Sequence, residues 1–302
     1  MIKSLNELLE KAQKQTTRKL VVAACQDEEV LKAVVEAAEM KIIEPILVGD
    51  IAKTEEIAKQ INVNINEYEK IEATELVEAA EISVKYVSSG KADFIMKGLI
   101  DTSILLKQVL NKDYGLRTDS LLSHVMVYEV PTYHKLVYLT DGGMNLAPSL
   151  DDKVKIAKNA AKVVKSLGND KVKIAVLAAK EKVNPKMPAT VEADKIKQMC
   201  EAGEFEEGVI IDGPLALDLA VSREAAETKG FESEVAGDAD ILLVPNIETG
   251  NGIGKSLTYF ANAESAGIIM GAKAPVVLVS RADTHEAKLN SIALGSLIAA
   301  YK

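Results

Sequence analysis

Residues 239–286 read ADILLVPNIETGNGIGKSLTYFANAESAGIIMGAKAPVVLVSRADTHE. The apolar run 241–245 is typical of a buried strand, and 246–254 carries glycines at alternate positions, as a loop does. The pattern then predicts a helix over 255–266 and, after a proline, a second strand over 276–279. Polar residues follow that second strand directly, and the carboxyl ends of strands are where α/β proteins usually keep their chemistry.

The rest of the chain alternates short apolar runs with segments of helical spacing. This alternation predicts repeated strand–helix–strand units, and right-handed crossovers between them place helices on both faces of a mostly parallel sheet. The length of 302 residues exceeds the size at which a single hydrophobic core usually stops growing. We therefore expect an α/β protein with two domains.

The composition limits the possible partners. A formal net charge of −9 argues against a nucleic-acid partner, which needs a basic face. No apolar run is long enough to span a bilayer, and the N-terminus lacks the apolar core of a signal peptide, so we expect no membrane partner and a cytoplasmic location. The two cysteines, Cys25 and Cys200, fit a reducing compartment and offer no zinc spacing. We expect no metal.

Ser280 and Arg281 are the first polar residues after the second strand of the opening stretch. A guanidinium is planar and always charged, so Arg281 suits a phosphate oxygen or the negative charge that develops on a carbonyl oxygen. Ser280 can donate to the same oxygen. The competing interpretation is a surface salt bridge, which is the usual role of an isolated arginine.

Asp283 and Glu286 have the spacing of a capping box that opens a final helix over 284–301. Either carboxylate could instead serve as a general base. The two interpretations stay open, and capping is the commoner one.

Four further residues are candidates for substrate binding. Lys97 follows a predicted strand over 93–96, and Thr102 lies just before a predicted helix over 103–110. This is a suitable place for a cation and a hydroxyl to meet a phosphate, although a solvated lysine is commoner. Ser123 and His124 precede another apolar strand, where a structural or surface histidine is commoner than a general base.

The glycine-rich segment supplies two more candidates, Asn251 and Gly252. The segment fits neither phosphate-binding template, because a P-loop needs Gly at Thr249 and the dinucleotide fingerprint needs one more residue before its third glycine. Nucleotide hydrolysis is therefore not expected. Free N–H groups of such a loop could still bind a phosphate or a carbonyl oxygen, and a tight turn is the competing explanation.

Several patches, in the same order along the whole chain, resemble the phosphate acetyl/butyryl transferase family, with the closer likeness to its butyryltransferases. They are DFIMKGLIDT (93–102), LLSHVMVYE (121–129), TDGGMNLAPSL (140–150), KMPATVEA (186–193), DGPLALDLAVS (212–222), VPNIETGNGIGK (244–255) and GAKAPVVLVSRAD (271–283). No single patch identifies the family, but the occurrence of all of them in the family's order is specific to it.

The resemblance implies a fold similar to that of isocitrate and isopropylmalate dehydrogenases, with two α/β/α domains and a cleft between them. The C-terminal segment then returns to the first domain. We expect domain I to comprise 1–135 and 268–302, and domain II to comprise 136–267. A homodimer or higher homo-oligomer is also implied.

The implied activity is acyl transfer between CoA and phosphate: butanoyl-CoA and phosphate give butanoyl phosphate and CoA, directly and without a tightly bound cofactor. Ser280 and Arg281 match the family's dipeptide at the reacting carbonyl. Phosphate acetyltransferases place a carboxylate base seven residues after that serine, and here the position is Ala287. Asp283, Glu286 or neither would then take the proton.

Two alternatives accompany this hypothesis. The enzyme could prefer acetyl-CoA, because one or two methylenes change discrimination by only about 1–3 kcal/mol each. The same fold could also serve a metal- and nicotinamide-dependent dehydrogenase, against which stand the missing dinucleotide fingerprint and the lack of an evident carboxylate cluster.

Overall fold

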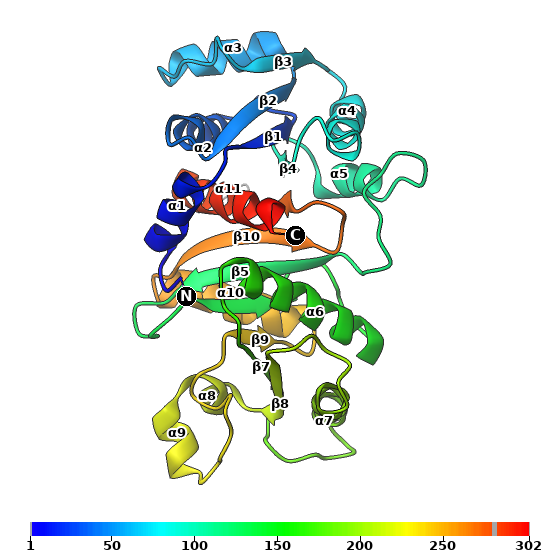
Figure 1. Cartoon of the computed structure of the whole chain (residues 1–302), viewed down its shortest axis with the longest axis vertical. Helices are drawn as coiled ribbons and strands as arrows, with labels where there is room; N and C mark the ends of the chain where they lie inside the picture. Colours follow the sequence, from blue (N-terminus) through cyan, green and yellow to red (C-terminus); the bar gives the residue numbers. More distant parts are fainter. Residues whose placement is uncertain (1, 280–282, 302) are drawn as a thin grey trace. The chain divides into compact units, whose positions relative to one another are not determined.

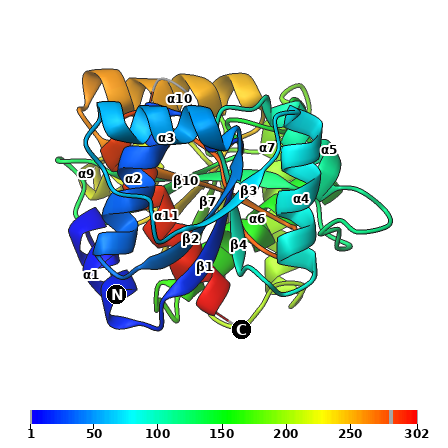
Figure 2. The ribbon, with the colours of Figure 1, turned by 90° about the horizontal axis from the view of Figure 1, so that it is seen from above.

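The computed structural model describes residues 2–279 and 283–301. The chain forms two compact units. Unit 1 comprises Leu121–Ser265 with the first residues of the chain, and unit 2 comprises Asn6–Ser120 and the chain from Ala266 onward. Figure 1 shows the elements of both units in the colours of the sequence, and Figure 2 shows them from above.

Unit 2 has a sheet in the order β3-β2-β1-β4-β11-β10. All neighbours in it are parallel except β10 and β11. Its elements are α1 (Leu5–Lys14), β1 (Arg18–Ala23), α2 (Glu28–Glu39), β2 (Ile43–Gly49), α3 (Ile51–Gln60), β3 (Glu69–Glu72), α4 (Leu76–Ser88), β4 (Phe94–Lys97), α5 (Thr102–Val109), β10 (Glu264–Met270), β11 (Val276–Val277) and α11 (His285–Ala300).

Helices cover both faces of the unit 2 sheet. In Figure 1, α2 and α11 lie on one face, and α4 and α5 lie on the other. The paired parts of the central strands, residues 20–23 of β1 and 94–97 of β4, are buried, and all of these residues except Lys97 are apolar, as in strands covered on both sides. A Cβ on Gly295 of α11 would lie 2.8 Å from the ring of Phe94. Glycine therefore lets α11 approach the sheet closely.

Unit 1 has a sheet in the order β5-β6-β9-β7-β8. β5 and β6 are antiparallel, and the other pairs are parallel. Its elements are β5 (Ser123–Glu129), β6 (Val137–Thr140), α6 (Leu150–Ser166), β7 (Val172–Leu177), α7 (Pro188–Glu201), β8 (Val209–Leu215), α8 (Leu217–Val221), α9 (Arg223–Thr228), β9 (Ile241–Leu243) and α10 (Ile247–Phe260).

The unit 1 sheet is also covered on both faces. α6 and α7 pack on one face, and α8 and α10 pack on the other (Figure 1). On the second face, Tyr128 and Leu139 of the sheet form a buried apolar cluster with Leu219 of α8, against which Ile253 and Leu257 of α10 pack. The predicted α/β class with mostly parallel sheets is thus confirmed.

The chain passes between the units near Ser120 and inside β10, at Ser265. We expected these crossings near residues 130–136 and near Gly267. The first difference has a clear cause: β5 pairs with β6, for example through Met126 and Leu139, so residues 121–135 group with the strand that follows them.

The predicted glycine loop at 246–254 is wrong, because α10 begins at Ile247 rather than at Lys255. Asn246 is the N-cap, and its side chain accepts a hydrogen bond from the N–H of Thr249 at 3.0 Å. Two of the glycines serve packing. A Cβ on Gly250 would lie 2.6 Å from Cα of Gly142, and one on Gly254 would lie 2.7 Å from the hydroxyl oxygen of Tyr128.

Two other local predictions are also wrong. Residues 264–266 belong to strand β10, not to the end of a helix, because β10 pairs with β11 through Ile268 and Ile269. Thr284, not Asp283, is the N-cap of α11, and its hydroxyl accepts from the N–H of Ala287 at 3.3 Å. The predicted capping box of Asp283 and Glu286 therefore does not form.

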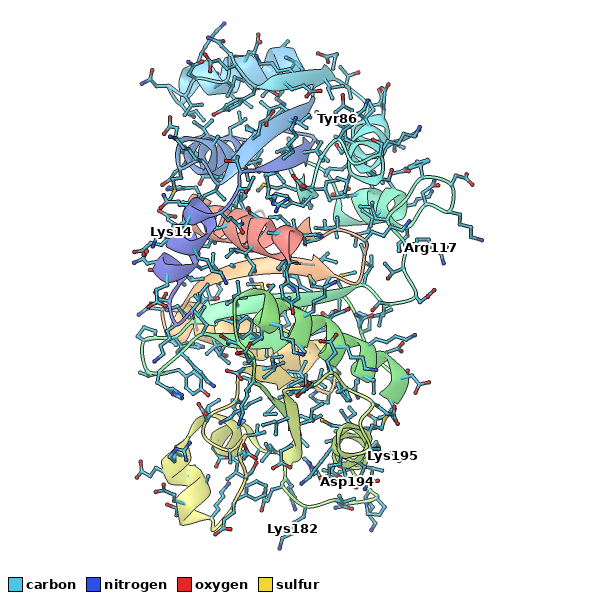
Figure 3. All side chains as sticks on the ribbon, in the orientation of Figure 1. Lys14, Tyr86, Arg117, Lys182, Asp194 and Lys195 are labelled. Atoms are coloured by element: carbon cyan, nitrogen blue, oxygen red, sulfur yellow. The ribbon has the colours of Figure 1, made fainter. Side chains whose placement is uncertain are left out.

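Arg117 and Lys182 are among the exposed charged residues, and Figure 3 shows their side chains pointing away from the ribbon. Among the residues that the structure describes, no helix is both long and apolar enough to cross a membrane.

Candidate functional site

The carboxyl ends of β1 and β4 mark a change in the direction of the chain in unit 2. From β1 the chain moves through α2 to β2 and β3 on one side, and α4 then carries it to β4 on the other side. The last residues of the two strands, Ala23 and Lys97, are paired. Such a switch point is the usual ligand site of an open α/β sheet.

Lys97 brings a positive charge to this switch point. Its side chain is 8% exposed, and its ammonium donates to the carbonyl of Gly98 at 3.4 Å. Gly98 is held against β1: its N–H donates to the carbonyl of Ala23 at 2.9 Å, and a Cβ there would lie 2.1 Å from the carbonyl oxygen of Ala24. Thr102, half-buried, begins α5 on the same connection.

β11 ends beside Lys97. Val277 of β11 is paired with Met96 of β4 in parallel register, so the chain leaves β11 at the edge of the sheet where Lys97 lies. The predicted residues Ser280 and Arg281 follow, and both lie outside the residues that the structure describes. Asp283 is described again, immediately before the N-cap of α11.

Asp283 and Glu286 differ in their surroundings. The backbone N–H of Glu286 itself, and then the hydroxyl of Thr284, hydrogen-bond to the Glu286 carboxylate and lower its pKa. Hydrogen bonds of this kind favour the charged form, so they weaken Glu286 as a base. The main-chain carbonyl of Asp283 accepts from the buried ammonium of Lys288. With Thr284 as the cap, Asp283 does not have the structural role that the sequence suggested.

Gln26 is a polar residue at this switch point that the sequence did not single out. It lies three residues after β1, is 7% exposed, and its Oε1 has no hydrogen-bond partner among the described residues. Oε1 lies against Gly49, where a Cβ would be only 2.3 Å away. The sequence feature that could have indicated Gln26 is its position just after a predicted strand.

Cys25, next to Gln26, is not a nucleophile in this environment. Burial raises the pKa of its thiol to about 11, although a hydrogen bond between the thiol and the hydroxyl of Thr54 opposes that rise. A thiol with such a pKa is almost entirely protonated at neutral pH.

Asp141 organises the carboxyl end of β6 in unit 1. Its carboxylate is 2% exposed and accepts four hydrogen bonds, from the N–H groups of Gly143, Met144 and His124 and from the side-chain amide of Asn145, at 2.6–3.1 Å. Buried carboxylates require such partners. Asp141 thus fixes the loop 141–145, a role that its sequence position alone did not reveal.

Ser123 and His124 lie at the start of β5, beside this loop. Ser123 is fully buried, and its hydroxyl oxygen accepts from the side-chain amide of Asn159 at 2.9 Å, so in this structure it joins α6 to the sheet. His124 is half-buried, and its ring lies against Gly143, where a Cβ would be 2.6 Å from Nδ1. The structure therefore places His124 next to the Asp141 loop and Ser123 in the core.

Asn251 and Gly252 lie in the second turn of α10, exposed to solvent. Their predicted role assumed free N–H groups in a loop, whereas N–H groups at this depth in a helix bond to carbonyls four residues earlier. The nearby contact of Gly142 with Gly250 joins α10 to the Asp141 loop.

Two groups of predicted residues thus come together. Lys97 and Thr102 share an edge of the unit 2 sheet with the segment that leads to Asp283, and His124 lies with Asp141 in unit 1. In the unit 2 group, Lys97 supplies a buried cation at the carboxyl end of the sheet, and such a cation can bind an anion. Within residues 2–279 and 283–301, no cluster of three His, Cys, Asp or Glu could hold a metal ion.

A family model described as phosphate acetyl/butaryl transferase matches residues 4–81 and 70–296. A phosphate butyryltransferase from Clostridium acetobutylicum is 46% identical over 302 residues, which are 100% of both chains. A phosphate acetyltransferase from Thermotoga maritima is 42% identical over 284 residues, covering 93% of this chain and 95% of the relative.

A solved structure gives the same picture. The branched-chain phosphotransacylase from Enterococcus faecalis superimposes with a TM-score of 0.82 and 34% sequence identity, covering 95% of this chain and 100% of that one. Sequence and structure thus point to one group of enzymes, and the similarity extends over nearly the full length of the chain.

Proposed function

Because the chain belongs to the phosphate acetyl/butyryl transferase family and is an acyltransferase, we propose that it is a phosphate butyryltransferase. It converts butanoyl-CoA and phosphate into butanoyl phosphate and CoA. The observation that carries the proposal is the 46% identity over both full lengths with the Clostridium acetobutylicum phosphate butyryltransferase. An acetyl preference is the second candidate, favoured by the 42% identity with the Thermotoga maritima phosphate acetyltransferase.

The transfer proceeds in one ternary complex. A phosphate oxygen attacks the thioester carbonyl, negative charge develops on the carbonyl oxygen, and the carbon–sulfur bond then breaks. Positioning and stabilisation of that charge supply most of the acceleration in such a reaction. Arg281 stabilises the oxyanion, Ser280 donates to it, and the Lys97 ammonium and Thr102 hydroxyl bind the phosphate. The protonated state of Cys25 supports a route without a cysteine acyl intermediate.

Asp283 is the general base of this proposal. It accepts the proton that the attacking phosphate loses and returns it to the departing sulfur; in the reverse direction it takes the proton of the thiol. Two observations support Asp283 over Glu286: Thr284 caps α11, and hydrogen bonds lower the pKa of Glu286. The position seven residues after Ser280, Ala287, has no side chain that could act as the base.

The remaining parts of the proposal concern the state of the enzyme. It acts as a homodimer or higher homo-oligomer in the cytoplasm, with CoA as a substrate and no tightly bound cofactor. The free thiols of Cys25 and Cys200 support a reducing compartment.

The proposed reaction is tested by measuring thiol release from acetyl-, propanoyl- and butanoyl-CoA, with and without phosphate. We expect release to require phosphate, to yield one acyl phosphate per thiol, and to have its highest kcat/KM with butanoyl-CoA. Each methylene that fills an apolar pocket contributes about 1–3 kcal/mol, or about 10–200-fold.

Two results would count against the proposal in different ways. Thiol release without phosphate would indicate hydrolysis rather than transfer. A highest kcat/KM with acetyl-CoA would replace the butanoyl substrate and leave the reaction intact.

Replacing Lys97 by Met should raise the KM for phosphate and lower kcat/KM by about 10–100-fold, the usual worth of a hydrogen bond to a charged group. Methionine keeps the length of the buried stem, so the fold should persist. Initial rates at varied phosphate and fixed butanoyl-CoA measure the effect. Lys91→Met, at an exposed lysine of the same unit, is the matched control and should leave both constants unchanged. An unchanged phosphate KM in Lys97→Met would remove Lys97 from the site.

A further inference from the structure

Helix α10 carries an exposed face that the chain's own packing does not explain. Gly250 and Gly254 face the interior of unit 1, against Gly142 and Tyr128. Gly252 faces the other way: it is exposed, and no heavy atom lies within 4 Å of where its Cβ would be. Glycine is among the poorest residues for a helix interior, so its place here calls for a reason outside unit 1.

Large apolar side chains are exposed at both ends of this helix. At its C-terminal end, Tyr259 is 69% exposed and Phe260 is 89% exposed. At its N-terminal end, Leu146 is 71% exposed, and its carbonyl accepts from the N–H of Ile247 at 3.0 Å, which attaches it to the first turn. These are the three most exposed large apolar side chains within the described residues.

Opposite charges lie between the two apolar ends. Glu248 and Lys255 are exposed and seven residues apart, so two helical turns place them on the same face. The midpoint of that pair falls between Asn251 and Gly252. From its beginning to its end, the exposed face of α10 thus carries an apolar residue, an acidic residue, a glycine, a basic residue and then apolar residues again.

A second copy of the same helix, running in the opposite direction, would place acidic residues against basic ones and apolar ends against apolar ends. In a contact with two-fold symmetry, residue i of one copy meets residue j of the other, and j meets i. Two copies of α10 that cross antiparallel at Gly252 place Glu248 opposite Lys255 twice, and Tyr259 and Phe260 near Leu146 twice. The missing Cβ at Gly252 lets the two backbones approach closely, as small residues do at helix crossings.

We propose that this face of α10 is the surface through which two copies of the chain associate, antiparallel about Gly252. The proposal rests on the homo-oligomer proposed above and not on the reaction. It names the contact: the Glu248–Lys255 pairs determine its direction, and the exposed apolar residues at the helix ends provide the apolar area.

A charge-exchange experiment tests the symmetry of this contact. Association is measured by sedimentation velocity over a dilution series. Glu248→Lys alone and Lys255→Glu alone should each weaken self-association by about tenfold or more, because like charges then face each other twice. An equimolar mixture of the two variants should associate about as tightly as the parent, since each supplies the charges that the other lacks.

Gly252→Leu separates loss of association from loss of folding. The new side chain points into open space, so the diluted variant should melt no lower than the diluted parent, while its self-association is lost. Phe260→Asp should weaken association as well. The control is Val183→Asp, which introduces the same charge at a position that is 49% exposed elsewhere in unit 1 and should have no effect.

Several outcomes would overturn the inference. A parent that is monomeric at every concentration would remove both the oligomer and the surface. A parent that associates, but whose affinity is unchanged in Gly252→Leu and in the single charge variants, would keep the oligomer and reject α10 as its surface. Failure of the variant mixture to recover association would reject the antiparallel arrangement.

Discussion

Replacing Asp283 by Asn should lower kcat for butanoyl transfer by about 10²–10⁴-fold, the usual contribution of a positioned general base. The amide keeps the size of the side chain and cannot accept the proton. Initial rates at saturating butanoyl-CoA and phosphate measure the loss of kcat.

Two neighbouring variants separate catalysis from capping. Thr284→Ala removes the N-cap of α11 and should cost about 0.5–2 kcal/mol of stability in a urea melt. Asp283→Asn should cost none of this. Glu286→Gln should keep kcat within a factor of about three, as expected for a surface carboxylate outside the chemistry. An Asp283→Asn variant that keeps its rate but loses stability would return Asp283 to a structural role.

Replacing Arg281 by Ala should lower kcat/KM by about 10²–10³-fold, as the loss of one oxyanion donor does in other acyl transfers. The guanidinium is charged at every working pH and can hold two oxygens at once. The loss should therefore appear in kcat as well as in KM, because charge on the carbonyl oxygen develops only during the reaction. Steady-state rates with butanoyl-CoA and phosphate measure it.

Arg281→Lys tests whether the planar fork matters. An ammonium keeps the charge but not the bidentate geometry, so this variant should recover only part of the lost rate. Arg117→Ala, at an exposed arginine of the same unit, should leave the rate unchanged. Full activity in Arg281→Ala would dismiss Arg281 from the chemistry and, with it, the main site prediction made from the sequence.

The alternation of strands and helices was readable in the sequence because each element buries an apolar face with its own period. The structure of the glycine-rich segment 246–254 could not be predicted from the sequence in this way. Its local pattern favours a loop, yet Asn246 caps a helix there, and Gly250 and Gly254 are required by contacts with Gly142 and Tyr128. Those contacts join residues more than a hundred positions apart in the chain, so no window of sequence contains them.

The candidate site divides in the same way. Lys97 was identifiable as a polar residue at a strand end, a position that the chain itself displays. The role of Asp141 could not be identified from the sequence, because its hydrogen bonds come from His124 on another strand and from a loop whose shape they determine. The N-cap of α11 was predicted at Asp283, one residue too early. Thr284, the next residue, can accept the same backbone hydrogen bond and is the N-cap.

Unit 2 is made of two segments that the whole of Leu121–Ser265 separates. β11 pairs with β4, and α11 packs against α2, so the last residues of the chain complete a core begun by the first. A ribosome releases those first residues long before the last ones exist. The apolar faces of β4 and α2 therefore stay exposed while the residues of unit 1 are synthesised. Unit 1 can fold before unit 2, although its synthesis begins later. Premature termination near Ser265 would leave a finished unit 1 attached to an unfinished and aggregation-prone partner.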